Sequence, residues 1–185
     1  MGNRRLSRKR LYQVEKAGQA IDLESSVGIK SAIKSATQHR QGQEIITEIA
    51  IDLGVTGILG GGGDDGVIGT TGAASAITQL TYAKYGYITE IRAICLEAPT
   101  GGHTQVNVAT KVNAEVQDNT ATERIADLGT IGEDTSYAID NYATLQTLAS
   151  EHYLFLTNAG GGDASQMDTG KFLIYLHGFV APDDI

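Results

Sequence analysis

The stretch "EIITEIAIDL" at residues 44–53 constrains the fold most strongly, because its apolar residues recur with a period of two. One side of the extended chain carries Ile45, Thr47, Ile49, Ile51 and Leu53. The other side carries Glu44, Ile46, Glu48, Ala50 and Asp52. Successive side chains of a strand point to opposite faces. The pattern therefore predicts a half-buried strand with an apolar inner face and a largely charged outer face.

A second alternation lies in "HTQVNVATKVNAEVQ" at residues 103–117. It predicts a long antiparallel strand with one wet face. We expect three valines to be buried: Val106, Val108 and Val112. We expect three polar residues on the opposite face: Asn107, Lys111 and Asn113.

Further strands are predicted in five segments: "AITQLTYAKY", "GYITEIRAICLEA", "ERIADLG", "EHYLFLTNA" and "KFLIYLHGFVA". The last two have two apolar faces, so we expect them to pair and to lie centrally. Cys95 is expected to be a small buried hydrophobe. "SYAIDNYATLQTL" is ambiguous and could form a helical turn or two. Gly-rich connections separate the segments, and the whole pattern predicts an all-β antiparallel sandwich.

The first 42 residues differ from the rest in charge. They hold nine Lys and Arg against three acids, for a net charge of +6, whereas residues 43–185 hold five against nineteen, for a net charge of −14. Apolar residues in this part recur mostly at helical spacings: Leu11, Val14, Ile21, Ile29, Ile33 and Ala36. We therefore predict a basic arm of partly helical or irregular structure at 1–42 and a β-sandwich domain at 43–185.

The basic start, "MGNRRLSRKR", has three interpretations: an ordinary disordered tail, a nucleic-acid-binding segment, or an arm that docks on an acidic protein surface such as that of a neighbouring copy. The acidic body argues against nucleic acid, because it would repel the same polyanion. We favour the docking arm. Its predicted partner-binding residues are Arg4, Arg5, Arg8, Lys9, Arg10, Leu11 and Val14.

No motif indicates catalysis, a cofactor or a metal centre. "GGGDDG" at 61–66 satisfies G-x-G-x-x-G, but no helical pattern follows it, as a dinucleotide site requires. Asp64 and Asp65 could supply oxygen ligands to calcium, yet Asp and Gly are also ordinary residues of loop tips. The four histidines, at 39, 103, 152 and 177, match no zinc spacing. We therefore expect no enzymatic activity and no cofactor.

No apolar run approaches the roughly 20 residues that span a bilayer, and no apolar stretch follows the basic start as in a secretory signal. The start nearly fits the myristoylation pattern, but Leu6 stands where Ser or Thr is needed. These features predict a soluble protein without a membrane partner.

Three stretches resemble virion structural proteins of tailed phages that infect marine cyanobacteria and related bacteria: "NRRLSRKRLYQVEK", "SATQHRQGQEIITEIAIDL" and "YLFLTNAGGGDASQMDTGKFLIYLHGF". The resemblance spans most of the chain. It implies a jelly-roll sandwich that decorates or cements the capsid as a trimer, with the major capsid protein or other virion subunits as partners. It also implies a protein made in the host cytoplasm that ends at the capsid surface of the virion.

Two functions therefore compete. The first is capsid decoration by a homotrimer. The last two strands are apolar on both faces, so one face should fill the sandwich and the excess should meet another subunit; the apolar residues are Leu154, Leu156, Leu173, Tyr175 and Phe179. The alternative is a receptor- or glycan-binding module of a tail or fibre, with the loops at 54–75 and 158–170 as its ligand mouth.

Overall fold

The structure is a computed structural model of the 185-residue chain. It describes residues 18–63, 66–116, 126–131, 138–140, 152–158 and 164–180, and it describes 126–131 and 138–140 by their backbone only. The predicted docking residues between 4 and 14, and the Asp pair at 64 and 65, lie outside this described part.

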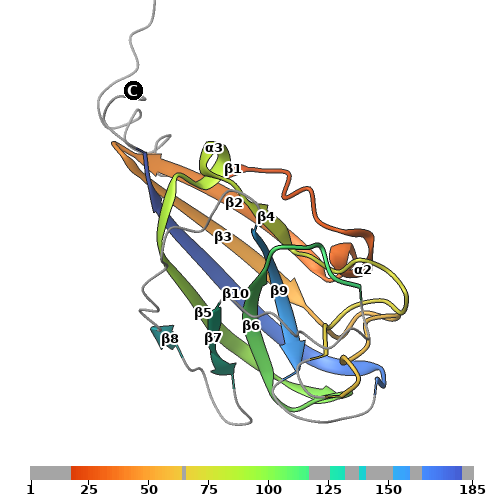
Figure 1. Ribbon diagram of the computed structural model, residues 1–185. Helices are drawn as coiled ribbons and strands as arrows, with labels where there is room; N and C mark the ends of the chain where they lie inside the picture. The colour runs from red at the N-terminus through yellow and green to blue at the C-terminus, as the bar shows by residue number, and fades with distance from the viewer. Residues whose placement is uncertain are drawn as a thin grey trace, which may run out of the picture.

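The chain folds into two antiparallel sheets that pack face to face (Figure 1). The six-stranded sheet has the order β1 (Gln19–Ala20), β2 (Ile33–Gln41), β3 (Glu44–Asp52), β10 (Met167–Phe179), β5 (Tyr87–Gly101) and β8 (Ala138–Asp140). The four-stranded sheet has the order β4 (Thr78–Leu80), β9 (His152–Asn158), β6 (Val106–Lys111) and β7 (Ala126–Ile131). Two one-turn helices are α2 (Val27–Lys30) and α3 (Tyr82–Tyr85). This confirms the predicted all-β antiparallel sandwich; its jelly-roll connectivity stays a prediction.

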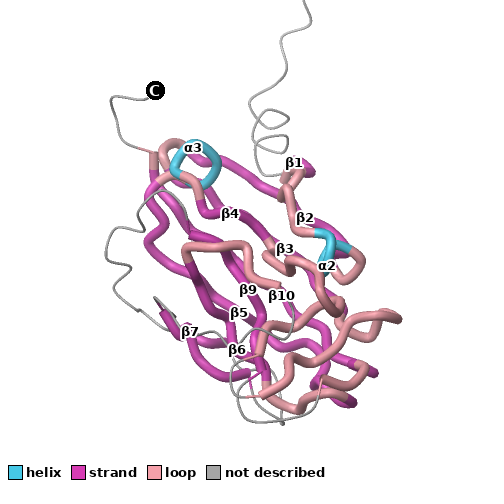
Figure 2. The backbone as a smooth tube through the Cα atoms, turned by 45° about the vertical axis from the view of Figure 1, so that its right-hand side comes forward, coloured by secondary structure: helices cyan, strands magenta, loops and turns pink. Residues whose placement is uncertain are grey.

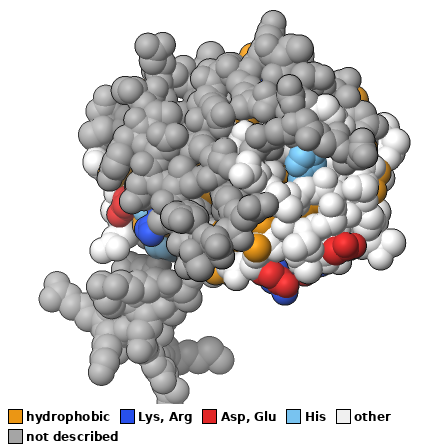
Figure 3. All heavy atoms as spheres, turned by 90° about the horizontal axis from the view of Figure 1, so that it is seen from below, with side chains coloured by type: hydrophobic (Ala, Val, Ile, Leu, Met, Phe, Trp, Pro, Cys, Tyr) orange, Lys and Arg blue, Asp and Glu red, His pale blue; other side chains and the backbone are white. Residues whose placement is uncertain are grey.

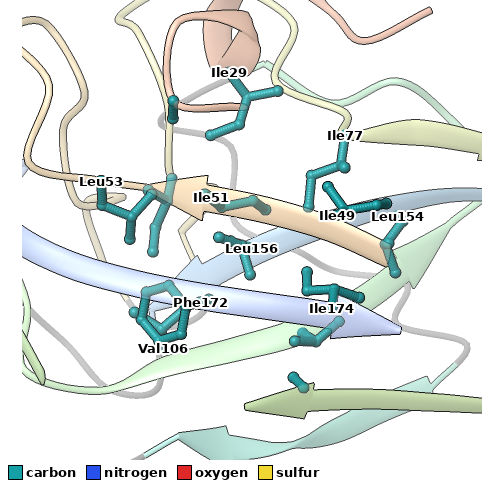
Figure 4. Close-up of a cluster of buried hydrophobic side chains, with 14 of the residues drawn as sticks. Ile29, Ile49, Ile51, Leu53, Ile77, Val106, Leu154, Leu156, Phe172 and Ile174 are labelled. Atoms are coloured by element: carbon teal, nitrogen blue, oxygen red, sulfur yellow. The ribbon is translucent and has the colours of Figure 1, made fainter. Parts of the chain in front are cut away.

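The core lies between the sheets, and β3 contributes to it as its alternation predicts. Its even-spaced residues, from Ile45 to Ile51, are buried, while those between them are only partly covered. Figure 4 shows Ile49 and Ile51 near side chains from both sheets, among them Leu156 and Phe172. Cys95 is buried in the same cluster, as predicted.

The predicted arm boundary at residue 42 is wrong. Residues 33–41 form the nine-residue strand β2, which pairs with β3 along its length, from Ile33 opposite Ile51 to Gln41 opposite Glu44. Gly42, with a φ of 62°, supplies the positive φ that this tight hairpin needs. The segment before it contributes to the core through Leu23 and Ile29. In its described part, from Gly18 on, the helical spacings yield one turn of helix, α2. The sandwich therefore includes residues 18–42.

The strand predicted at 104–116 is shorter and more buried than expected. β6 spans six residues, all of them buried, and it lies between β7 and β9 in the small sheet. Val106 and Val108 are buried as predicted, but Val112 is 43% exposed. Asn107 and Lys111, expected on a wet face, are buried. A salt bridge of 2.8 Å between Lys111 Nζ and Glu115 Oε1 compensates part of the cost of burying the ammonium group.

The last two predicted strands exist and lie centrally, but they do not pair. β9 lies between β4 and β6, whereas β10 lies between β3 and β5 in the other sheet. Both are interior strands of their sheets. The segment "AITQLTYAKY" forms the three-residue strand β4 and then turns into α3. Figure 2 shows α3 at one end of the sandwich, and most of the long loops lie toward the opposite end.

Candidate partner-binding surface

The outward side of the six-stranded sheet is the candidate site. We define the outer face as the alternate positions of four adjacent strands that point away from the core. They are Ser35, Thr37, His39 and Gln41 of β2; Glu44, Ile46, Glu48, Ala50 and Asp52 of β3; Lys171, Leu173, Tyr175, His177 and Phe179 of β10; and Tyr87, Glu90, Arg92, Ile94, Leu96 and Glu97 of β5. Because these positions lie on hydrogen-bonded neighbouring strands, the strand register fixes which of them lie side by side.

The outer face is acidic. It carries five carboxylates, at 44, 48, 52, 90 and 97, against two permanent cations, at 92 and 171. One cation is matched locally, because Lys171 Nζ contacts Glu97 Oε2 across the β5–β10 pair. Partial burial raises the pKa of Tyr175, and its hydrogen bond with Glu48 raises it further. His177 Nδ1 lies 3.7 Å from Glu44 Oε1, an ion pair whenever the imidazole is protonated.

Three exposed aromatic rings gather at one end of this face. Tyr87 is 58% exposed, Phe179 43% and Tyr82 37%. The rings of Tyr82 and Tyr87 have centroids 4.5 Å apart at an interplanar angle of 53°. Phe179 lies opposite Tyr87 in the register of β10 and β5. We call Tyr82, Tyr87 and Phe179 the aromatic end of the outer face.

Gly86 makes the aromatic end possible. It follows α3 with a φ of 66° and a ψ of −158°, a conformation that only glycine adopts readily. A Cβ at this position would lie 2.4 Å from the backbone oxygen of Phe179. The close approach brings α3 against the end of β10, so that Tyr82 and Tyr87 meet. Aromatic rings are enriched among the residues that dominate binding at protein interfaces, so this end is suited to hold a partner.

A second surface lies at the opposite end, where the described parts of the Gly-rich loops meet. The Gly60 N–H donates to the Ser165 carbonyl at 2.9 Å. The Gln166 side chain accepts from the Gly57 N–H and donates to the Val55 carbonyl, both at 3.0 Å. Asn158 Nδ2 donates to the carbonyls of Gly61 and Gly63. The described parts of the loops at 54–75 and 158–170 therefore lie side by side; that they form a ligand mouth stays a prediction.

His103 is the notable side chain at this loop end. Its Nε2 is buried without a hydrogen-bond partner, and burial lowers the pKa of His103. It lies beside Gly60, where a Cβ would come within 3.2 Å of the ring. Figure 3 looks at the molecule from below, toward this end, and shows a histidine set among polar and backbone atoms. Within the described ranges, no group of three or more His, Cys, Asp or Glu could hold a metal ion.

The remaining predicted residues divide between the core and the outer face. Leu154 and Leu156 are buried between the sheets, so they cannot contact another subunit in the folded protein. Leu173, Tyr175 and Phe179 lie on the outer face. The sequence did not reveal the aromatic end, although "TYAKYGY" places three tyrosines around a glycine. The acidic side of β3 was predicted from the period of two.

No protein-family model, curated protein or solved structure matches this chain. Among the described residues, no helix is long and apolar enough to cross a membrane.

Proposed function

We propose that this protein is a non-enzymatic structural protein of a tailed-phage virion that decorates or cements the capsid. The observation that supports this best is the outer face, which combines exposed aromatic rings, carboxylates and a rigid sheet. Its partner would be the major capsid protein or another virion subunit at the capsid surface. The proposal also rests on the resemblance of the three stretches of sequence to phage virion proteins.

The size of the outer face fits a protein interface. Four strands spaced about 4.8 Å apart and nine residues long cover roughly 600 Å². A standard interface buries about 800 Å² per partner. The face alone therefore falls somewhat short, and a second contact is needed for stable attachment. The basic N-terminal segment, with Arg4, Arg5, Arg8, Lys9 and Arg10, is our candidate for that contact.

The direct test is to fractionate phage particles and to ask whether the protein stays with emptied heads or with tails. We expect it on emptied heads. The double variant Tyr87→Ser/Phe179→Ser should then bind emptied heads at least about tenfold more weakly, because exposed aromatic anchors carry much of the energy of an interface. Val27→Ser, which changes a residue that is 83% exposed and lies in α2, is the matched control and should bind as wild type. Recovery with tails alone would reject capsid decoration.

One observation favours the alternative, a receptor- or glycan-binding module of a tail or fibre. The loop end joins three loops around His103, whose buried Nε2 has no hydrogen-bond partner. A sugar hydroxyl could supply that partner. This alternative predicts that the protein fractionates with tails and that His103→Ala abolishes binding to host-surface glycans, while Tyr87→Ser/Phe179→Ser leaves it unchanged.

A further inference from the structure

We propose that the aromatic end of the outer face binds the arginine-rich segment, residues 1–17, of a neighbouring copy of the same chain. The inference rests on the proposed assembly function and names a specific partner for its surface. It explains why an acidic body carries a basic segment. Each copy has the basic segment that binds the next copy and the acidic, aromatic surface that is bound.

The chemistry of the aromatic end selects guanidinium groups. Exposed rings at Tyr82, Tyr87 and Phe179 attract cations over their faces, and arginine is the cation most often found there. Two carboxylates flank these rings. Glu44 lies opposite Phe179 in the register of β3 and β10, and Glu90 follows Tyr87 on β5. A planar guanidinium can stack on a ring and bond a carboxylate at the same time, which an ammonium group cannot do as well.

The segment before Gly18 has the matching composition. Residues 1–17 contain six Lys and Arg and one acid, for a net charge of +5. Four of the cations are arginines: Arg4, Arg5, Arg8 and Arg10. Leu6, Leu11 and Val14 are interleaved with them. The outer face has the same alternation, since the row Ala50–Leu173–Ile94 is apolar and lies next to the polar row Glu48–Tyr175–Arg92.

The segment is long enough to reach a neighbouring copy. The described chain begins at Gly18, beside the edge strand β1. The five clustered cations lie 8 to 14 residues before this point, or about 26 to 46 Å of extended chain. The whole six-stranded sheet is only about 24 Å wide. In addition, the pairing of Gln19 with Gln38 and of Ala20 with Thr37 means that the chain enters β1 from the end at which β2 turns into β3. A segment of this length, joined to the sheet edge at that end, can span from one copy to the outer face of the next.

Such a contact is heterologous, because the segment and the outer face are different surfaces. Repeated heterologous contacts close into rings when the rotation between copies permits. This gives the predicted homotrimer a specific mechanism, in which each copy holds the segment of the next.

Complementation between two full-length variants tests the proposal. The segment variant is Arg4→Gln/Arg5→Gln/Arg8→Gln/Lys9→Gln/Arg10→Gln. The face variant is Glu44→Lys/Glu90→Lys. We expect wild type to self-associate at micromolar concentration and each variant alone to be at least about tenfold weaker, as for the loss of interface hot spots. Their mixture should form a one-to-one heterodimer, because one intact segment then meets one intact face. Light scattering and sedimentation with one fluorescent partner measure this.

The control variant Glu24→Lys/Asp168→Lys makes the same charge change at two exposed positions outside the outer face and the aromatic end, and should associate as wild type. Thermal unfolding of every variant establishes that it is folded. A wild type that stays monomeric, a face variant that associates as wild type, or a mixture that stays monomeric would each overturn the proposal. Self-association is measured without phage particles. A wild type that self-associates but is recovered with tails and not with emptied heads therefore rejects capsid decoration while the contact between copies stands.

Discussion

The outer faces of the two sheets contrast sharply, although both sheets share one core. On the four-stranded sheet the outward residues of β6 are buried and those of β9 are buried or half-buried: Phe155 packs with Val67 and Ala76, and Lys111 forms its salt bridge away from water. On the six-stranded sheet the outward residues are at least partly exposed, and many are charged. A central strand can therefore have both of its faces covered, as in the four-stranded sheet, or one face open to water, as in the six-stranded sheet. The contrast identifies the six-stranded sheet as the side that is open to a partner.

The largest expected effect compares two phenylalanines on these outer faces. Phe155→Ala should reduce the free energy of unfolding by about 3–5 kcal/mol, because it removes a fully buried ring and leaves a cavity. Phe179→Ala should change it by about 0.5 kcal/mol or less, since the ring is already exposed. Urea denaturation followed by circular dichroism measures both. Equal losses would show that the two faces are alike.

The second test compares two tyrosines at alkaline pH. Burial raises the pKa of Tyr85 to about 12, above the unfolded value near 10. The folded state therefore holds its proton more tightly. Its stabilisation is complete below about pH 10 and is lost as the pH rises to about 12, a change of roughly 2–3 kcal/mol. Tyr85→Phe should abolish most of this drop.

At neutral pH, Tyr85→Phe removes one hydrogen bond and should cost about 1 kcal/mol. The Tyr85 hydroxyl lies 2.7 Å from Thr78 Oγ1, which itself donates to the Leu23 carbonyl at 2.9 Å, so Tyr85 is the donor between them. Tyr175→Phe, on the outer face, should leave most of the alkaline drop in place. Denaturation midpoints between pH 8 and 12 compare the variants. A drop that survives Tyr85→Phe would contradict the assignment.

The smallest expected difference compares two Lys–Glu pairs. Lys111→Met should cost about 2 kcal/mol, because the pair with Glu115 is largely shielded from water. Lys171→Met should leave the free energy of unfolding nearly unchanged, because both members of the pair with Glu97 are exposed. Met keeps the packing of the aliphatic stem in both cases, so the difference reports the charge. If added salt weakened the Lys111 pair as much as the Lys171 pair, the small sheet would be open to water.

The sequence predicted those strands whose two sides differ. β3 alternates apolar and charged residues, and its inner and outer sides were assigned correctly. The prediction for β6 failed because Asn107 and Lys111 are polar residues on a buried side. A period of two assigns polar residues to the exposed face, and here that assignment is wrong. β2 failed because this strand, one in from the sheet edge, buries little, and its sequence, "IKSATQHRQ", shows no apolar alternation. What reveals β2 as a strand is its partner β3 and the Gly42 turn, which are tertiary information.

The candidate surface was predictable only in part. The carboxylates at 44, 48 and 52 follow directly from the alternation of β3. The aromatic end depends on α3, on the positive φ of Gly86 and on the register that places Phe179 opposite Tyr87. These residues are 92 positions apart in sequence. No local pattern could have brought them together, and the predicted hairpin of the last two strands would have separated them.

The short strand β1 has a mechanical consequence. Any pull on the N-terminal segment enters the sandwich at Gly18 and acts first on β1, which is held by two residue pairs and by the hydrogen bond from the Ile21 N–H to the Ala36 carbonyl. The next anchors along the chain are Leu23 and Ile29, and moving them requires opening the core. Under load, residues 18–22 should therefore peel away and lengthen the tether by about 3.3 Å per residue while the sandwich stays folded. The edge of the sheet thus acts as a short extensible coupling between the body and whatever its segment holds.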